Sequence, residues 1–331
     1  MRTSLFSCMM ILRSTRKILD RVSSSTNQKA MMFIKEFPRI IQGMMLMQTI
    51  FMLLFLETKV RSVEVVGRFS GPNDHIFIYY TDHGAAGLLG MPTGTPSVFA
   101  IDLIDVLKKK HAAKGYKSMV FYLEACESGS IFEGLLPKNV SIYAPTSANA
   151  EEDGYATYCP GQPGIPAEYD TCLGDLFSIS WMEDCDKNDL HKETLEKQYE
   201  RVRRRTNDSH VMQYGDMSHR KEFLLTYMGA DPANDSYTSM EDISSPSISR
   251  VVSQRDADLL HLHHKFHNAP AGSHTKLEAQ KQLLDEIAHR KLVDYRINKI
   301  GDKIGELLFG HQKSSKVLLN VRPQRQPLVD D

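Results

Sequence analysis

The chain has 331 residues, of which 41% are hydrophobic and 24% are charged, an ordinary globular composition with enough length to bury a large core. Its formal net charge of -1 lacks the basic excess typical of proteins that bind DNA or RNA, so we expect no nucleic-acid partner. The five cysteines form no CxxC pair, which argues against a zinc ribbon, and we expect neither a metal nor a cofactor.

The N-terminal part of the chain differs in composition from the rest. Residues 1–56 contain eight Lys or Arg, two acids and nine of the sixteen Met. The apolar run from Met44 to Leu56 has 13 residues, too few for an unbent bilayer span, so we expect no stable membrane span. Neither this run nor the apolar start at Met1 precedes a clear small-residue cleavage site, so a signal peptide is not convincing.

Strand and helix patterns alternate in the middle of the chain. Residues 75–80 (HIFIYY) form a short apolar and aromatic run that ends in a turn-like segment, which is typical of a buried parallel strand. Residues 118–125 (SMVFYLEA) predict the next strand. Between them a helix is predicted, with Thr95 as N-cap, Pro96 as first residue and Gly115 as stop. A right-handed βαβ unit makes the two strands parallel, so the residues that follow them emerge at one edge of the sheet.

Two residues with the chemistry of a thiol peptidase follow these two strands. His83 lies in the turn after the first strand, and Cys126 lies just after the second. A thiol attacks a carbonyl only as thiolate, so it needs an imidazole that takes the proton and N–H donors for the oxyanion. We predict His83 as general base and Cys126 as nucleophile, with the backbone N–H groups of Gly84 and Cys126 as oxyanion donors. The alternative is an inert buried cysteine and a structural loop histidine.

The second half of the chain predicts one more strand, a linker and a helical appendage. Residues 140–146 (VSIYAPT) predict a third strand, and the polar stretch around Tyr199 predicts a helix with one apolar face. Residues 230–256 are rich in Ser, Asp and Pro and predict a linker. Apolar residues at helical spacing predict a helix over residues 275–309.

Cysteine and asparagine patterns bear on the compartment. Cys159 and Cys172 flank a Pro/Gly-rich loop, which can close as a disulfide in an oxidising compartment or carry two thiols otherwise. The N-x-S sequons at Asn139, Asn207 and Asn234 are candidate glycosylation sites that agree with secretion, although such triplets also arise by chance.

Four longer motifs are specific enough to compare with known proteins: NDHIFIYYTDHG, MVFYLEACESGS, YDTCLGDLFSISWMED, and KQYERVRRRT with SHVMQYGD. They closely resemble the legumain family, the asparaginyl endopeptidases called vacuolar processing enzymes in plants, and TYCPG with its Pro-rich loop is similar to the plant branch. The resemblance begins at about Phe69 and runs to the end of the chain. It implies a caspase-like three-layer α/β/α fold with a mostly parallel sheet, incomplete here at its N-terminal strands, plus a helical C-terminal appendage.

The resemblance also implies an activity and further site residues. The family cleaves proteins or peptides after Asn, less well after Asp, and is inhibited by its own propeptide, which is thus a second partner. Glu124 in EAC and Asp175 in LGD would accept hydrogen bonds from the substrate amide, although alone they suggest solvated carboxylates or a helix cap. Asp82 occupies a position that can form a succinimide associated with peptide ligation, and otherwise shapes the turn. Where many relatives have Ser in the pocket, this chain has Asp153 and Gly154.

On this resemblance the chain divides into four parts. They are an unrelated or poorly ordered segment (1–68), a partial peptidase core (69–229), the linker (230–256) and a partial helical activation peptide and prodomain (257–331). The family normally supplies its first strands, an Asn that orients the base and an Arg-His pair before the core, so we expect impaired activity. The alternatives are a peptide asparaginyl ligase or an inactive binding or regulatory fragment. The resemblance implies a lytic or protein-storage vacuole, reached by the secretory pathway.

A histidine-rich stretch, DADLLHLHHKFHNAP, resembles the activation peptide of the family. His261, His264 and His267 have the spacing i, i+3, i+6, which raises the question of a metal site. Helical histidines rarely complete a coordination shell without a carboxylate or Cys, so we expect none here. A pH-responsive role in propeptide release is the interpretation we favour.

Overall fold

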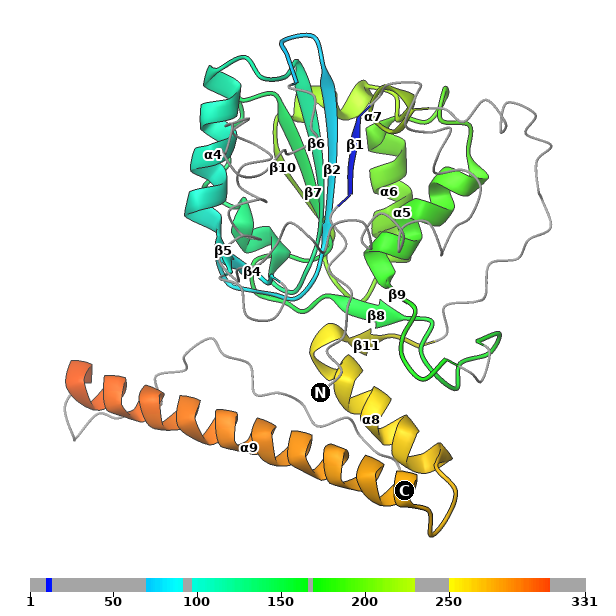
Figure 1. The fold of residues 1–331 in the computed structure, drawn as a ribbon. Helices are drawn as coiled ribbons and strands as arrows, with labels where there is room; N and C mark the ends of the chain where they lie inside the picture. The colour runs from blue at the N-terminus through cyan, green and yellow to red at the C-terminus, as the bar shows by residue number, and fades with distance from the viewer. Residues whose placement is uncertain (1–9, 14–69, 92–96, 166–168, 230–249, 310–331) are drawn as a thin grey trace, which may run out of the picture. The chain divides into compact units, whose positions relative to one another are not determined.

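The computed structural model describes residues 10–13, 70–91, 97–165, 169–229 and 250–309. The apolar run from Met44 to Leu56, the sequon at Asn234 and the proposed cap at residues 95–96 lie outside these ranges. Two compact units are present (Figure 1). The first runs through Gly154 and includes Leu176–Ser244, and the second consists of Tyr155–Asp175 and the chain from Ser245 onward.

A five-stranded sheet with the order β1-β2-β6-β7-β10 is the centre of the first unit. Its three middle strands, β2 (His75–Thr81), β6 (Ser118–Glu124) and β7 (Ile142–Thr146), are parallel, as the sequence predicts. The edge strands β1 (Met10–Arg13) and β10 (Met212–Gly215) are antiparallel to their neighbours. The predicted mostly parallel sheet is confirmed. Residues 10–13, which lie in the segment (1–68) that we predict to be unrelated or poorly ordered, form β1 and pair with β2.

Both faces of this sheet are buried, which explains why its middle strands are continuously apolar. Along β6, Met119, Phe121 and Leu123 enter one core cluster, while Val120 and Tyr122 enter the other. Helix α4 (Ala100–Ala112) covers the first face, and α5 (Leu176–Lys187) and α6 (Leu195–Arg205) cover the second (Figure 1). The predicted three-layer arrangement is therefore confirmed.

Helix α4 begins later than the sequence predicts. A small antiparallel sheet forms first, from β3 (Gly84–Ala85), β4 (Leu88–Leu89) and β5 (Val98–Phe99). Phe99 then takes an extended conformation as N-cap, without a side-chain hydrogen bond. Pairing of β5 with β4 thus overrides the helix-start signal of the Thr-Pro pair, because tertiary strand pairing outweighs local propensity.

Short elements complete the first unit. The run LFSISW lies at the start of α5, and the predicted polar helix around Tyr199 is α6. The described part of this unit also contains the 3-10 turns η1 (Ser128–Ile131) and η2 (Met217–Lys221) and the helix α7 (Leu225–Met228).

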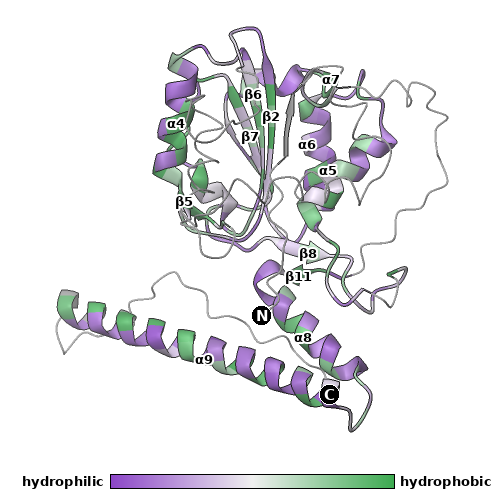
Figure 2. Cartoon of the chain, in the orientation of Figure 1, coloured by the Kyte–Doolittle hydropathy of each residue, from purple (hydrophilic) through white to green (hydrophobic). Residues whose placement is uncertain are grey.

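The described part of the second unit contains a three-stranded sheet and two helices. Its strands have the order β11 (Val252–Ser253), β8 (Tyr155–Thr157), β9 (Gly174–Asp175), so the end of the predicted linker belongs to a sheet. A 3-10 turn, η4 (Gln254–Asp256), leads into α8 (Ala257–Asn268). Helix α9 (His274–Phe309) confirms the predicted long helix, and polar and apolar residues alternate along it (Figure 2). None of the helices in the described ranges combines the length and apolar character that crossing a membrane requires.

Candidate active site

The ends of β2 and β6 bring the predicted base and nucleophile to one edge of the sheet. The two strands pair in parallel register, so Thr81 lies opposite Glu124. Just beyond them the N–H of Asp82 donates to the carbonyl of Glu124 at 3.3 Å. His83 and Cys126 each lie two residues past these paired ends, as the predicted βαβ unit requires.

The turn that carries His83 packs tightly against the backbone of Cys126. A Cβ atom on Gly84 would lie 2.6 Å from the carbonyl oxygen of Cys126 and 2.9 Å from the Cβ of Ala125. On the other side, the N–H of Gly90 donates to the carbonyl of His83 at 2.8 Å, and a Cβ there would lie 2.7 Å from the same oxygen. Only glycine allows these approaches. His83 itself is exposed, whereas Cys126 is buried.

The thiol of Cys126 lies in a mixed electrostatic environment. The N–H of Gly154 donates to its Sγ at 3.4 Å, an interaction that favours the thiolate. However, Sγ and one carboxylate oxygen each of Glu127 and Asp153 all lie within 4.8 Å of one another. Negative charge at that distance disfavours the thiolate. Asp153 and Gly154, which the sequence leaves uncertain, thus have opposite effects on the same sulfur.

Glu152 holds this part of the loop in place. Its carbonyl accepts from the N–H of Glu127 at 2.7 Å, and Glu127 has a left-handed φ of 47°. Its carboxylate accepts from the N–H of Asn149 at 2.8 Å and from the N–H of His210 at 2.6 Å. The imidazole Nδ1 of His210 lies 2.8 Å from the second oxygen. The sequence pattern does not reveal this role, because Glu152 and His210 are far apart along the chain.

Two buried serines fix the turn that follows Cys126. The Oγ of Ser147 lies 3.2 Å from both the N–H and the carbonyl of Ala125. The Oγ of Ser128 accepts from the N–H of Ala148 at 3.0 Å and lies 3.2 Å from the Oγ of Ser147. These hydrogen bonds connect the chain on both sides of Cys126 to the residues just after β7. The sequence signals available were the position of Ser147 directly after a predicted strand and of Ser128 two residues after Cys126.

The acidic residues predicted around the site have different surroundings. Glu124 is fully buried, and its Oε2 accepts from the N–H of Ser178 at 3.0 Å and from its Oγ at 2.9 Å, in the first turn of α5. This contact matches the helix-cap alternative, since a carboxylate stabilises a helix N-terminus. Asp82 accepts from the N–H of His83 at 2.7 Å and so shapes the turn. Asp175 belongs to the second unit, where it pairs with Ala156. The substrate-binding and succinimide roles stay predictions.

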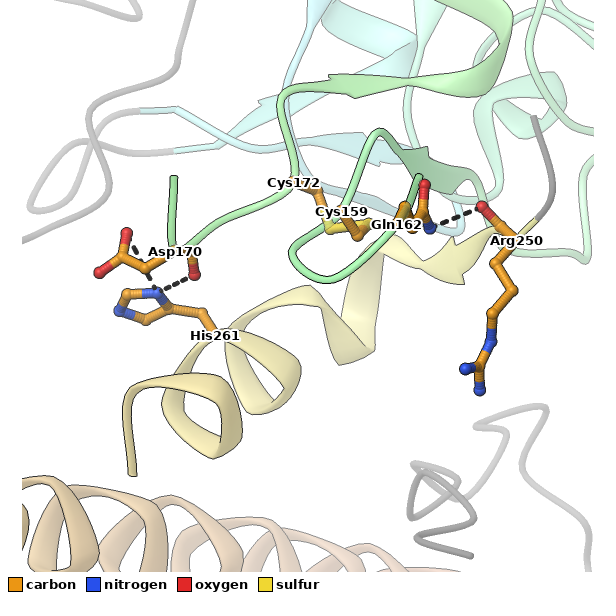
Figure 3. The surroundings of a disulfide bond; sticks show 6 residues. All are labelled: Cys159, Gln162, Asp170, Cys172, Arg250 and His261. Atoms are coloured by element: carbon orange, nitrogen blue, oxygen red, sulfur yellow. Dashed lines mark hydrogen bonds and ion pairs between the residues drawn. A yellow bond between two sulfur atoms is a disulfide. The ribbon is translucent and has the colours of Figure 1, made fainter. Parts of the chain in front are cut away.

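Cys159 and Cys172 form a disulfide in the second unit (Figure 3). The loop that they close contacts the end of the predicted linker at Arg250 and helix α8 at His261. Gln162 donates through Nε2 to the carbonyl of Arg250 at 2.9 Å, and Nδ1 of His261 lies 2.6 Å from the carbonyl oxygen of Asp170 (Figure 3). The disulfide-closed loop therefore holds the start of the segment that contains α8.

The sequons and the histidine set complete the predicted sites. Asn139 and Asn207 are exposed. The histidines His261, His264 and His267 do not converge on a common point. His264 lies 3.1 Å from the amide nitrogen of Asn268, while His261 faces the disulfide-closed loop and His267 faces a different histidine.

Comparisons with known proteins agree with the motifs. Residues 48–230 match the Peptidase C13 family, and residues 281–331 match the legumain prodomain. The first match begins upstream of the predicted boundary at residue 69.

Several curated relatives are plant proteins. A vacuolar-processing enzyme of Citrus sinensis is 57% identical over 268 residues, which cover 79% of this chain and 53% of the relative. One from Vicia sativa is 53% identical, covering 79% and 54%. A legumain of Canavalia ensiformis is 47% identical, covering 79% and 56%. The chain spans about half the length of these relatives.

Proposed function

Because the chain belongs to the Peptidase C13 family, we propose that it is a cysteine endopeptidase with Cys126 as nucleophile and His83 as general base. The observation that carries this proposal is the parallel register of β2 and β6, with Gly84 closed on the backbone of Cys126. An imidazole and a thiol must lie close together to exchange a proton, and neighbouring parallel strands that end at the same edge of the sheet bring the residues that follow them together.

In the proposed reaction, His83 takes the thiol proton of Cys126, and the thiolate attacks the carbonyl carbon of the scissile peptide bond. The backbone N–H groups of Gly84 and Cys126 stabilise the resulting oxyanion. Collapse of this intermediate breaks the C–N bond, and the imidazolium gives its proton to the leaving amine. Water, deprotonated by His83, then hydrolyses the thioester and returns the thiol.

We propose further that cleavage follows Asn and, less well, Asp, with Glu124 and Asp175 accepting hydrogen bonds from the substrate carboxamide. Acid pH would help an Asp substrate, because protonation gives its carboxyl group a donor. The name of the relatives in Citrus sinensis and Vicia sativa, vacuolar-processing enzyme, supports a vacuolar role. The match of residues 281–331 to the legumain prodomain supports the chain's own C-terminal part as an intramolecular partner.

A peptide probe with Asn next to a thiol-reactive electrophile tests the proposal. We expect mass spectrometry to locate the adduct on Cys126, and labelling to fall strongly in His83→Ala. Cys185 is an internal control, since burial raises the pKa of its thiol to about 12. Equal labelling of Cys126 and Cys185 would refute the proposed site. Labelling of Cys126 that does not depend on Asn in the probe would refute the proposed specificity. A probe in which Gln replaces Asn measures the specificity separately.

A further inference from the structure

Helix α8 carries two histidines whose rings face each other across one turn. His263 and His267 are four residues apart, so their side chains lie on the same face of the helix. Their Nε2 atoms are 3.1 Å apart, and the ring centroids are 4.3 Å apart with the planes at 41°. This pair differs from the set His261, His264 and His267, whose spacing in the sequence suggests a metal site. The side chains of that set do not converge on a common point.

The separation of the two nitrogens matches the geometry of a metal chelate. Imidazole nitrogens bind transition metals at about 2.0–2.1 Å, so two of them at adjacent corners of a tetrahedral or square site lie roughly 2.9–3.4 Å apart. Without metal, one ring donates its Nε2–H to the other. With metal, the donating ring carries its proton on Nδ1 instead, so both Nε2 lone pairs point at the ion and both rings stay neutral.

We propose that His263 and His267 form a two-nitrogen chelate for a transition-metal dication that prefers imidazole, such as Cu²⁺, Ni²⁺ or Zn²⁺. Water fills the remaining coordination positions, because His267 is exposed and His263 is only partly buried. The usual order of divalent-metal affinities makes Cu²⁺ the tightest of the three. This proposal departs from the sequence-based expectation that the chain holds no metal.

The surroundings of the pair are compatible with a neutral chelate. Burial lowers the pKa of His263, and the neighbouring His267 and His264 act in the same direction. The amide nitrogen of Asn268 lies near the ring of His264, so that histidine has a different neighbour. His264 is therefore a matched control on the same helix.

Metal binding would stabilise α8. A chelate that joins residues four apart exists only while the intervening turn is helical, so the metal binds the folded helix in preference to the unfolded one. At its N-terminal end α8 is held through Asp256, which pairs with Arg290 of α9 at 2.7 Å. The chelate adds a second constraint near the C-terminal end of α8. The expected consequence is slower proteolysis within α8 when metal is present.

The test uses the full chain with its free thiols alkylated, titrated with Ni²⁺ by calorimetry and loaded with Cu²⁺ for electron paramagnetic resonance. We expect His263→Ala and His267→Ala each to weaken Ni²⁺ binding by about tenfold or more, and His264→Ala to leave it within about twofold. The Cu²⁺ spectrum should show hyperfine coupling to two nitrogens in the His264→Ala chain. It should show coupling to fewer nitrogens in His263→Ala and in His267→Ala.

The result that overturns the proposal is equal loss of affinity in all three variants, or wild-type affinity in His267→Ala. His267→Gln, which keeps a polar side chain on an exposed helix position, gives the same readout if the alanine variant folds poorly. Limited proteolysis with and without Ni²⁺ provides a second measurement. Protection of α8 in the His264→Ala chain but not in the His267→Ala chain supports the chelate, and equal protection in both contradicts it.

Discussion

Strand β6 and helix α9 differ in the interactions that hold them in the fold. All seven residues of β6 are buried between two layers of helices. Helix α9 is far longer, and among its described side chains the large apolar ones exposed are Leu277, Leu284, Leu292, Tyr295, Ile300 and Leu307. Its clearest anchor is Arg290, whose guanidinium bonds to Asp256, Glu286 and the carbonyl of Arg255, each at 2.7 Å. The first region therefore depends on close packing, and the second on individual polar attachments.

Gly84→Ala should have the largest effect, because it attacks the close packing at the end of β2 and β6. The added Cβ would lie 2.6 Å from the carbonyl oxygen of Cys126, so the His83 turn must move away. A displacement near 1 Å at a catalytic pair costs about 100-fold in rate, and we expect kcat/KM to fall by at least about that factor. Gly71→Ala is the matched control, since a Cβ there meets nothing within 4 Å. Equal activity in both variants would contradict the proposed site.

The sequence predicts the closely packed strands β2 and β6 well, and the edge strand and the long-range polar contacts poorly. The strands β2 and β6 are continuous apolar runs, so the amino-acid pattern alone places their ends, and with them His83 and Cys126. The edge strand β1 could not be placed in this way, because four residues of MILR carry no register of their own. The Glu152–His210 contact joins residues 58 apart in sequence, and no local pattern encodes such a pair.

Arg290→Ala should have the next largest effect, confined to the second unit. It removes three hydrogen bonds made by a side chain that is 11% exposed, one of them the 2.7 Å pair with Asp256. Breaking a mostly buried pair of this kind costs about 2 kcal/mol after allowing for solvent access. Hydrogen exchange should accelerate in α8 and α9 but not in β6. Arg296→Ala, at an exposed position on α9, is the control, and faster exchange in β6 would show that the attachment also supports the sheet.

Glu222→Gln tests a polar attachment inside the first unit. The hydrogen bond that His219 donates to the Glu222 carboxylate raises the pKa of His219. Burial raises the pKa of Glu222, but hydrogen bonds from His219 and Tyr227 outweigh it, so its net pKa lies below the usual value. The His219 contribution is present below about pH 6.5 and is lost as pH rises through its raised pKa. The Glu222 contribution is present above about pH 4.5 and is lost as pH falls.

The stabilisation by this pair should therefore be largest between about pH 4.5 and 6.5. Thermal unfolding should show a loss of about 1 kcal/mol in Glu222→Gln near pH 5.5, and a smaller loss at pH 8. Glu200→Gln removes only an exposed pair with Arg203 and should change little at either pH. An effect of Glu222→Gln that grows with pH would show that the sign of this linkage is wrong.

Asp153→Ser should have the smallest effect and the opposite sign, because it improves the site. The Asp153 carboxylate and the Cys126 sulfur lie within 4.8 Å, so its charge opposes the thiolate that Gly154 stabilises. Removing the charge should lower the thiol pKa and raise the rate of alkylation about threefold at a fixed pH below that pKa. Glu151→Ser is the matched control, since it removes an exposed acid two residues away in the same loop. A slower reaction in Asp153→Ser would mean that this carboxylate holds the Cys126 thiol in position. The closely packed end of β6 would then also depend on a polar contact.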